Sequence, residues 1–524
     1  MSLKNNNLNL NSNEINRFSN YKLEDYIFDV ENIGLEKTWD KICLFCLEKH
    51  PTKNGLISVN NFGEMYEIGL AIEDKLAKKK SGQYYTPDDV ANIMAQWLNN
   101  CEGDAVCDVA CGTGKLILTY LKLIGFDSAR TLILNKKLFL YDFDKVALKI
   151  CKTAILMIYG FDLEDKVNDI YGDFLDEKII LPKNCKVIAN PPYAKIENFP
   201  STWRITNVTK DTKEFYSVFM EKIFKQSKST VIITPFSFIS GKKFQSLRQY
   251  MCEIGNGSIF AFDNVPGNIF CGRKHGIFNT NTANSVRAAI TVFSKSESLK
   301  GFRVTPLIRF KNEERNKLLK CDILEKLLSN EYQICDKQNT MFKKVFKELE
   351  PIYNSWISNS TFKVKDLLSK TENDFIIDMP NTCRYFTTGS AKKLSRGGSI
   401  VMYARDEDTY NFLYCFINSS FTYWWWRIFD GGITYPTGLL FNMPIPLNLL
   451  INEEDKKFFK NMRIEMVSKE SSYTVTKVNA GVPQQNIKFP DSYRIDINNR
   501  ICKLLNIEIK NDIFSLVHSN KFGK

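Results

Sequence analysis

The residues Asn190-Pro191-Pro192-Tyr193 bring together an amide, a rigid turn and an aromatic ring. They follow a short run over 186–189 that has the character of a buried strand entering a loop. Two consecutive prolines fix the backbone and exclude a helix at this point. Amide and carbonyl oxygens beside an aromatic ring are suited to hold a flat base by its amino group. An ordinary turn after a strand explains four such residues equally well, so the surrounding chain must decide between the two.

The chain has 524 residues, of which 44% are hydrophobic and 25% are charged, and a formal net charge of +12. These values are typical of a soluble globular protein with two or three domains. The positive charge favours a nucleic-acid partner but is weak evidence by itself. No apolar run is long enough to span a membrane, and the polar N-terminus does not resemble a signal peptide. We therefore expect a cytoplasmic protein with no membrane partner.

The 14 cysteines are scattered along the chain, as expected for reduced thiols in a cytosolic protein. Cys43 and Cys46 form a Cys-x-x-Cys pair with His50 close behind. A zinc site needs a fourth ligand, usually from a second pair, and the neighbouring sequence does not supply one. We interpret this pair as helical core cysteines and expect that the protein requires no metal.

The segment 81–89 carries the signals of a helix start. Thr86 is a predicted N-cap residue, Pro87 fits the first helical position, and an acidic pair follows in the first turn. Capping explains the segment fully as structure. The same helix start also suits a ligand carboxylate, because backbone N–H groups and the Thr86 hydroxyl attract anions.

Two glycines follow a predicted strand over 105–109. Gly112 and Gly114 permit a cofactor to approach the backbone of this strand-to-helix turn closely. The turn is not a phosphate-binding P-loop, because the first glycine and the final Ser or Thr of that motif are missing. Asp108, at the end of the strand, is a candidate partner for the charged amino acid portion of a cofactor.

Acidic residues also follow the next two predicted strands. Asp142 ends the second strand, where a carboxylate can accept from both hydroxyls of a ribose. Asp144 is the competing choice for that role and otherwise caps the following helix. Asp173 and Phe174 follow the third strand, where they are candidates to bind and stack on an adenine. Taken singly, each of these residues could equally serve only the hydrogen bonding of its own loop. A common binding site is favoured because such residues follow successive strands of the predicted βα units.

The order of these motifs resembles that of the γ group of bacterial methyltransferases that modify the N6 amino group of adenine in DNA. The residues that carry the resemblance are 82–87, 108–114, Asp142, 173–174 and 190–193, in this order. The resemblance is most specific over about residues 81 to 295 and continues more loosely to about residue 447. The set of motifs in this order is strongly specific, whereas no single motif is.

The resemblance implies a Rossmann-like α/β fold with a mostly parallel sheet of seven strands and S-adenosylmethionine as the methyl donor. We expect an N-terminal helical region over 1–80, a catalytic domain over 81–300 and an α+β target recognition domain over 301–524. The implied activity is site-specific methylation of a flipped-out adenine in double-stranded DNA. The implied role is the modification enzyme of a restriction–modification system or a solitary epigenetic methylase. A separate cognate restriction endonuclease and a nucleoid-associated location in a bacterium are further expectations.

The resemblance also assigns cofactor contacts to individual residues. Thr86 would meet the methionine carboxylate, Asp142 would hold the ribose, and Asp173 would accept from the adenine amino group. The full set expected to line the cofactor is Tyr85, Thr86, Asp108, Ala110, Cys111, Gly112, Gly114, Asp142, Phe143, Asp173, Phe174 and Asn190.

The implied catalytic residues are Asn190, Pro191, Pro192 and Tyr193. Asn190 and the Pro191 carbonyl would accept from the target amino group, and Tyr193 would stack on the base. Phe270 best matches the aromatic residue that covers the second face of the base, with Phe278 as the alternative and core packing as the competing explanation. The other expected DNA contacts are Lys195, Arg384, Lys392 and Lys393.

Several alternatives stay open at this point. A cytosine-N4 methyltransferase uses similar chemistry but typically has Ser or Asp in place of Asn190. An enzyme that methylates protein glutamine or RNA guanine can also carry the Asn-Pro-Pro-Tyr motif, but it would not need the basic C-terminal half. The chain could also be a modification subunit that needs a separate specificity partner, or a subunit that binds without catalysing transfer.

Overall fold

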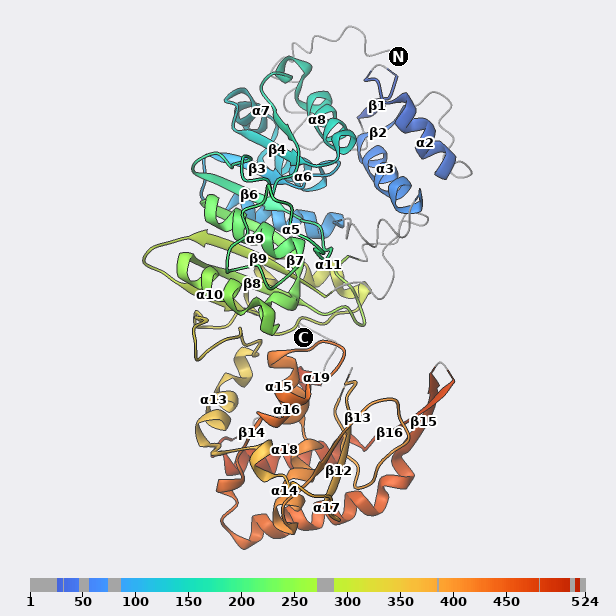
Figure 1. The fold of residues 1–524 in the computed structure, drawn as a ribbon, viewed down its shortest axis with the longest axis vertical. Coiled ribbons are helices and arrows are strands. Elements are labelled where there is room, and N and C mark those ends of the chain that lie inside the picture. Colours follow the sequence, from blue (N-terminus) through green and yellow to red (C-terminus); the bar gives the residue numbers. More distant parts are fainter. Residues whose placement is uncertain are drawn as a thin grey trace. The chain divides into compact units, whose positions relative to one another are not determined.

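A computed structural model describes residues 26–31, 33–46, 56–73, 86–270, 287–383, 386–479, 481–508 and 514–518. The chain forms two compact units, whose elements are labelled in Figure 1. The first unit contains Met1–Val304 and Ile308–Phe342, and the second contains Thr305–Leu307 and Lys343–Lys524. The predicted division at residue 300 therefore differs from the observed one, because the segment after that residue returns to the first unit.

The centre of the first unit is an eight-stranded sheet with the order β10-β8-β9-β7-β6-β3-β4-β5. Its strands are β3 (Ala105–Val109), β4 (Leu138–Asp142), β5 (Asn168–Tyr171), β6 (Cys185–Ala189), β7 (Ser229–Pro235), β8 (Gly255–Phe262), β9 (Ala288–Lys295) and β10 (Gly301–Val304). Neighbouring strands are parallel except for β9, which runs antiparallel to both β7 and β8. The predicted Rossmann-like, mostly parallel α/β sheet is confirmed.

The predicted number of seven strands is wrong by one. β10 pairs in parallel with β8 and forms an edge of the sheet that the sequence did not reveal. Its four residues are too few to show a period, and its glycine is unfavourable in a strand. The central strands were visible because β3 and β6 are buried along their whole length. Such burial on both faces gives continuous apolar runs in parallel sheets.

Helices cover the sheet of the first unit. They are α5 (Asp88–Asn99), α6 (Lys115–Ile124), α7 (Phe126–Leu134), α8 (Lys145–Tyr159), α9 (Phe215–Gln226), α10 (Gln245–Ile254), α11 (Arg315–Leu318) and α12 (Cys321–Glu325). Helix α5 packs against α6, and α9 packs against α10 (Figure 1). The Trp97 ring of α5 stacks on Phe260 of β8 with 4.2 Å between centroids. This contact helps to fix the C-terminal end of α5 relative to the sheet.

The described part of the predicted N-terminal helical region contains two helices and a short pair of strands. These elements are β1 (Ile27–Asp29), α2 (Glu36–Cys46), β2 (Leu56–Ser58) and α3 (Val59–Glu73). β1 and β2 pair antiparallel, and the Phe28 ring stacks on Phe62 of α3 at 4.3 Å. Helix α3 also contacts α8, so this region packs on the first unit.

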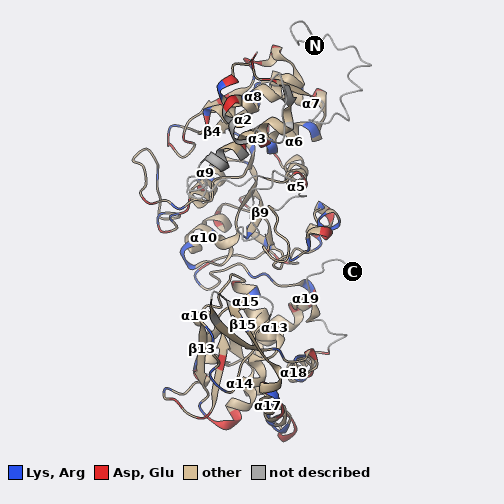
Figure 2. Cartoon of the chain, turned by 90° about the vertical axis from the view of Figure 1, so that its right-hand side faces the viewer, with Lys and Arg blue, Asp and Glu red and all other residues tan. Residues whose placement is uncertain are grey.

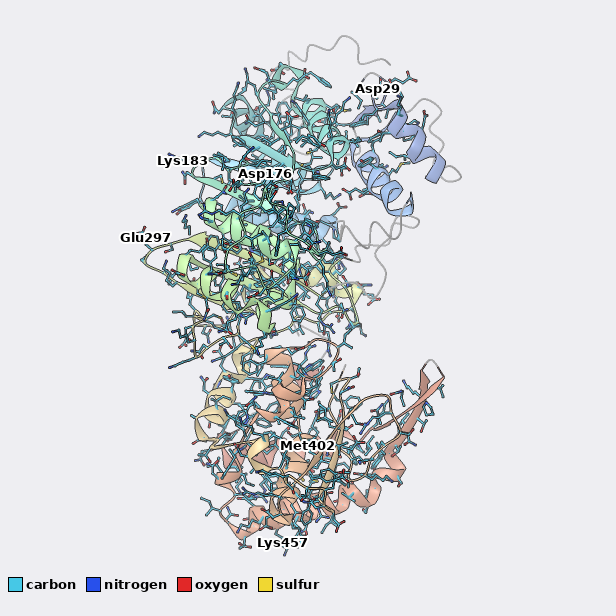
Figure 3. All side chains as sticks on the ribbon, in the orientation of Figure 1. Asp29, Asp176, Lys183, Glu297, Met402 and Lys457 are labelled. Carbon is cyan, nitrogen blue, oxygen red and sulfur yellow. The ribbon has the colours of Figure 1, made fainter. Side chains whose placement is uncertain are left out.

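The second unit is an α+β structure, as predicted. Its helices are α13 (Glu350–Asn359), α14 (Glu407–Ile417), α15 (Ser420–Phe429), α16 (Thr437–Phe441), α17 (Glu453–Tyr473), α18 (Asp491–Leu504) and α19 (Ser515–His518). Its strands form three antiparallel pairs, β11 (Phe362–Lys363) with β14 (Pro444–Ile445), β12 (Ile376–Pro380) with β13 (Ser399–Tyr403), and β15 (Thr474–Asn479) with β16 (Val482–Ile487). One aromatic core unites them, including Trp424 of α15 and Met402, which is labelled in Figure 3.

Candidate functional site

Most of the predicted cofactor and catalytic residues lie at the carboxyl ends of β3, β4, β5 and β6 or on the loops that follow these strands. In the register of the sheet, Val109 of β3 lies opposite Ala189 of β6, so the loops that start at Ala110 and Asn190 leave the sheet side by side. The chain continues to β4 and β5 on one side of β3 and to β7 on the other side of β6. Open α/β sheets bind ligands at such a switch point, outside the carboxyl ends of the strands.

The loop after β3 has a backbone shape that few residue types tolerate. Ala110 has a φ of 62°, which costs a non-glycine residue about 1–2 kcal/mol. Gly112 and Gly114 have φ values of 53° and 94°. A Cβ atom on Gly114 would lie 2.6 Å from the Cys151 sulfur of α8, so close packing also requires glycine here. Strained backbone of this kind concentrates at functional sites.

A buried and a half-buried carboxyl group, those of Asp108 and Asp142, lie beside this loop. Both oxygens of Asp108 are buried and have no hydrogen-bond partner at normal geometry in the part of the chain that the structure describes. Burial raises the pKa of Asp108 well above its ordinary range, the Asp142 carboxylate raises it further, and the Ile117 N–H opposes the shift. Burial also raises the pKa of Asp142, which accepts the Gly112 N–H at 2.7 Å. A cationic group that brings N–H donors would satisfy Asp108, so the site fits the ammonium of an amino acid.

Asp144 takes the structural role that was one of its two predicted alternatives. It is the N-cap of α8, and its Oδ1 accepts the N–H groups of Val146 and Ala147. Its Oδ2 accepts the Tyr66 hydroxyl of α3 at 2.8 Å. Asp144 is therefore engaged on both oxygens. Phe143, the residue before it, has 74% of its surface exposed and offers an apolar ring beside Asp142.

The loop after β5 differs from expectation in one respect. Asp173 lies at the strand end, and its Oδ2 accepts the Trp203 indole N–H at 2.6 Å. Phe174 is only 4% exposed, and its ring packs on Phe219 with 5.4 Å between centroids. The Lys222 ammonium lies 4.8 Å from the same ring. The expected stacking of the Phe174 ring on an adenine therefore disagrees with its position in the core, because neighbours from α9 already surround it.

The segment 194–212 lies between β6 and α9. Trp203, in its middle, is buried and contacts Phe215 edge-to-face at 5.4 Å. A β-bridge joins Trp203 to Asp176, which is labelled in Figure 3 and accepts Lys222 at 2.7 Å through its carbonyl. The segment thus folds back on the loop after β5. Lys195, a predicted DNA contact, is exposed.

Thr86 and Asn190 are joined directly. The Asn190 side-chain Nδ2 donates to Thr86 Oγ1 at 2.9 Å. The prediction that Thr86 caps α5 is wrong, because the N-cap is Pro87 and no side chain caps the helix there. The Thr86 hydroxyl instead faces the end of β6, across 104 positions of sequence. Tyr85, also predicted to contact the cofactor, lies outside the described residues.

The two aromatic residues expected to enclose a base lie against each other. The Tyr193 hydroxyl donates to the Ile233 carbonyl at 3.1 Å, which holds the ring at the end of β7. The Phe270 ring meets Tyr193 edge-to-face, with 5.8 Å between centroids and 63° between planes. A base stacked between two rings needs about 7 Å, or two van der Waals separations of about 3.5 Å. The structure therefore brings the pair together without a space as wide as a base.

The DNA contacts predicted in the second unit are Arg384, Lys392 and Lys393. Lys392 and Lys393 are exposed, and the Lys393 ammonium lies 3.9 Å from Glu372. Arg384 lies outside the described residues. Arg396, close in sequence, is buried in an ion pair with Asp378 at 2.8 Å and is structural. Helix α17 carries both signs of charge in Figure 2, so it does not form a basic face.

Sequence reasoning missed the contacts of α3 with the loop after β3. The Glu67 carboxylate accepts the Thr113 hydroxyl at 2.8 Å, and its Oε1 would lie 3.5 Å from a Cβ on Gly112. Lys115 forms ion pairs with Asp88 of α5 and with Glu64 of α3. The acidic residues of α3 look like an ordinary polar helix face in the sequence. Only the packing of α3 over the loop reveals their position.

Over the described ranges, no group of three or more His, Cys, Asp and Glu side chains could hold a metal ion. Among the helices in the same ranges, none combines the length and the apolar character needed to cross a membrane.

The chain was compared with known proteins to find its relatives. The chain is 25% identical to the type II methyltransferase M.PstI of Providencia stuartii over 249 residues, 43% of this chain and 47% of that protein. It is 21% identical to the methylase subunit of the type I restriction enzyme MpnII of Mycoplasma pneumoniae over 296 residues, 52% of this chain and 51% of that protein. A solved complex of DrdV with DNA shares 15% identity and a TM-score of 0.44 over 62% of this chain and 38% of that chain.

The chain spans about half the length of the curated relatives it matches. The model of the N-6 DNA methylase family matches residues 58–379, a range that begins near α3 and contains all the predicted motifs. This match covers more than half of the sequence, and the chain therefore belongs to the N-6 DNA methylase family.

Proposed function

We propose that the chain transfers a methyl group from S-adenosylmethionine to the N6 amino group of an adenine in double-stranded DNA. The observation that carries the proposal is the hydrogen bond from Asn190 Nδ2 to Thr86 Oγ1 at 2.9 Å. It orients the amide so that Oδ1 is the acceptor end, at the switch point of the sheet. The family match supports the reaction class.

The Thr86 hydroxyl connects the two halves of the proposed site. Because its oxygen accepts from Asn190, its own hydrogen can be donated to another acceptor. The methionine carboxylate at the start of α5 is the acceptor that we propose. In this arrangement a single hydroxyl holds the cofactor on one side and the catalytic amide on the other.

The loops after β3 and β4 would hold the rest of the amino acid and the ribose. S-adenosylmethionine supplies a methyl group that is already activated on a positively charged sulfur. Asp108, whose buried oxygens have no hydrogen-bond partner at normal geometry in the described chain, would bind the ammonium. Asp142 would accept from the ribose hydroxyls, and the left-handed Gly112 would let the ligand approach the backbone.

The cofactor adenine would lie at the loops after β4 and β5. The exposed Phe143 ring is the apolar surface that we propose stacks on it, in place of the buried Phe174 ring. Asp173 would accept from the adenine amino group. Trp203 already donates to one Asp173 oxygen, and a carboxylate has about four lone-pair sites, so capacity is left for a second donor.

The residues after β6 would prepare the target amine. An exocyclic adenine amine is a poor nucleophile because its lone pair is delocalised into the ring. The Asn190 oxygen and the Pro191 carbonyl would accept its two hydrogens and favour the tetrahedral nitrogen that develops on attack. The base must leave the duplex stack to reach them. Stacking on Tyr193 would offset part of this cost, at about 1–3 kcal/mol per base.

We further propose that the second unit recognises the DNA sequence, with Lys392 and Lys393 at phosphates. Its own aromatic core supports an independent recognition module. The alternative is a modification subunit that needs a separate specificity partner. The relative from Mycoplasma pneumoniae, a type I methylase subunit, favours this alternative. A separate cognate endonuclease would perform any cleavage, and a location in the bacterial cytoplasm near the nucleoid follows from a DNA substrate.

The test is transfer by the purified chain from methyl-labelled S-adenosylmethionine to duplex DNA, followed by digestion and nucleoside chromatography. Label in N6-methyldeoxyadenosine is expected. Label in N4-methyldeoxycytidine would contradict adenine as the target, and label that resists DNase would point to protein or RNA. Transfer that appears only after a partner subunit is added would establish the multisubunit alternative. An Asn190→Ala variant controls for contaminating activity.

A further inference from the structure

Arg315 joins two parts of the first unit that are far apart in sequence. It begins α11, and only 3% of its side chain is exposed. Its Nε and Nη2 atoms donate to the two oxygens of Asp89, each at 2.8 Å. This two-pronged pair is the strongest form of arginine–carboxylate contact. Asp89 lies in the first turn of α5, three residues after Thr86.

The same guanidinium also holds the loop after β8. Arg315 Nη1 donates to the Asn268 carbonyl at 2.7 Å, and Nη2 donates to the Ile269 carbonyl at 2.9 Å. These bonds together with the Asp89 pair use four of the five N–H groups of the side chain. The next residue along the loop is Phe270, whose ring contacts Tyr193.

A second arginine secures the other end of this loop. Arg309 donates through Nε and Nη2 to Asp263 Oδ2, each at 3.2 Å, and Asp263 also accepts Arg287 at 2.9 Å. All three side chains are buried or nearly so. The loop over 263–270 is thus held at its start by Arg309 and at its end by Arg315.

We call the hydrogen bonds of Arg315 to Asp89, Asn268 and Ile269 the Arg315 bridge. Its two ends lie at the two sides of the proposed base site, which we call the Asn190 wall and the Phe270 wall. One end is the start of α5, where Thr86 accepts from Asn190 at 2.9 Å. The other end is the backbone immediately before Phe270. Asn190 is expected to hold the target amine, and Phe270 covers Tyr193. Arg315 is the group through which hydrogen bonds connect one wall to the other.

We propose that Arg315 is a positioning residue that sets the separation between the Asn190 wall and the Phe270 wall. The inference rests on the proposed function, because the walls matter for transfer only if a base lies between them. The rigid guanidinium fork suits this task, since it fixes a carboxylate and two carbonyls in one plane. A lysine keeps the charge but reaches only some of these partners. A displacement of about 1 Å at a reacting centre costs on the order of 100-fold in rate.

The first experiment compares Arg315→Lys and Asp89→Asn with the unaltered chain, using amplified and therefore unmethylated genomic DNA. We expect kcat to fall about 10- to 100-fold in both variants. The Kd for S-adenosylmethionine, measured by calorimetry, should rise by a smaller factor than kcat falls, because the bridge contacts only the start of α5 and not the loops after β3 and β4 that would hold the ammonium and the ribose. The matched control is Arg303→Lys in β10, where the arginine donates to one carbonyl, that of Ser329, at 2.9 Å. This control should retain kcat.

A second measurement does not depend on the substrate. Hydrogen exchange in the protein without ligands should become faster over 263–270 and at the start of α5 in Arg315→Lys. Exchange in β3 and β6 should stay as slow as in the unaltered chain. Equal exchange over 263–270 in both proteins would refute the bridge, whatever the chain methylates.

The outcomes separate the two claims. Faster exchange with unchanged kcat would show that the bridge is structural only and would overturn the positioning role. A loss of cofactor affinity as large as the loss of kcat would also overturn the positioning role, because the cofactor site would then be affected as much as the base site. If the unaltered chain methylates no DNA adenine, the proposed function fails, and the positioning role falls with it. The exchange experiment would still decide whether the bridge exists.

Discussion

The two halves of the proposed site differ in how complete they are. The donor half, formed by the loops after β3, β4 and β5, has a strained backbone at Ala110 and a buried carboxylate, Asp108, without a hydrogen-bond partner at normal geometry in the described chain. The acceptor half, formed by Asn190, Tyr193 and Phe270, has its two rings packed edge-to-face at 5.8 Å. In the donor half, the buried oxygens of Asp108 thus await a ligand that can donate to them. In the acceptor half, the rings of Tyr193 and Phe270 already contact each other.

This difference suggests an order of events. A positively charged group would satisfy Asp108, so we expect the proposed donor half to receive the cofactor with little rearrangement. The acceptor half must separate Phe270 from Tyr193 before a base can lie between them, since about 7 Å is required. We therefore expect cofactor binding to depend on buried acids and DNA binding to depend on a movement of rings.

The largest effect is expected from Asn190→Ala. Removing the acceptor for the target amine should lower kcat by about 100- to 1,000-fold, the usual cost of losing one preorganised hydrogen-bonding group. Calorimetric affinity for S-adenosylmethionine should stay near that of the unaltered chain. A comparable loss of cofactor affinity would show that the two halves are not separable at Asn190. The matched variant Asn264→Ala removes a half-buried amide from the loop after β8 and should have a much smaller effect on kcat.

The next effect is expected from Asp108→Asn in the donor half. The neutral amide cannot match the cofactor ammonium, and we expect the Kd for S-adenosylmethionine to rise about 10- to 100-fold, as for a lost charge-assisted hydrogen bond. Titration calorimetry measures this change directly. An unchanged affinity for S-adenosylmethionine would show that Asp108 does not bind the cofactor.

The pH dependence of stability provides a separate test of Asp108. Burial raises its pKa above the ordinary value of 3.8, so the folded chain binds this proton more tightly than the unfolded chain. The resulting stabilisation is complete below about pH 4 and is lost as the pH rises through the raised pKa. Asp108→Asn cannot titrate and should therefore gain stability relative to the unaltered chain between about pH 5 and pH 8. Thermal unfolding without ligand measures the difference, and a constant difference would contradict the raised pKa.

A smaller effect is expected from Phe270→Leu in the acceptor half. The substitution keeps an apolar side chain but removes the stacking surface, and a loss of about 1–2 kcal/mol corresponds to a rate about 10-fold lower. Thermal unfolding should show a stability loss of only about 1 kcal/mol. Unchanged transfer by a folded variant would assign Phe270 to the core alone, which the sequence already offered as the competing explanation.

The smallest effect is expected from replacing Lys392 and Lys393 by glutamine. If both lysines contact phosphates, the slope of log affinity against log salt concentration should fall by about 2, and binding should weaken by a similar factor on all sequences. Fluorescence anisotropy on duplexes at several salt concentrations measures the slope. An unchanged slope would show that Lys392 and Lys393 do not contact DNA phosphates. Lys457 of α17, labelled in Figure 3, offers a control because it lies among acidic residues on a mixed helix.

Local patterns in the sequence were sufficient where the physical cause is local. The apolar runs of β3 and β6 predicted the centre of the sheet, and Asp144 before an apolar period predicted a helix cap. The order of the motifs predicted the family, and the family model confirms it. These features depend on burial, capping and spacing within a few residues.

Contacts between distant segments could not be predicted in this way. Thr86 was expected to cap α5, but the partner of its hydroxyl is Asn190. Phe174 was expected to face a ligand, but Phe219 and Lys222 of α9 surround it. Arg315 carries no local signal at all, because its partners come from α5 and from the loop after β8. The roles of the individual site residues stay predictions until the substitutions above are measured.

The most direct test of the central claim is sequencing of cellular DNA with detection of modified bases, in cells that carry the unaltered chain or Asn190→Ala. We predict N6-methyladenine at one defined sequence with the unaltered chain and its loss with the variant. Methylation at cytosine, marks that persist with the variant, or DNA without any added mark would contradict it.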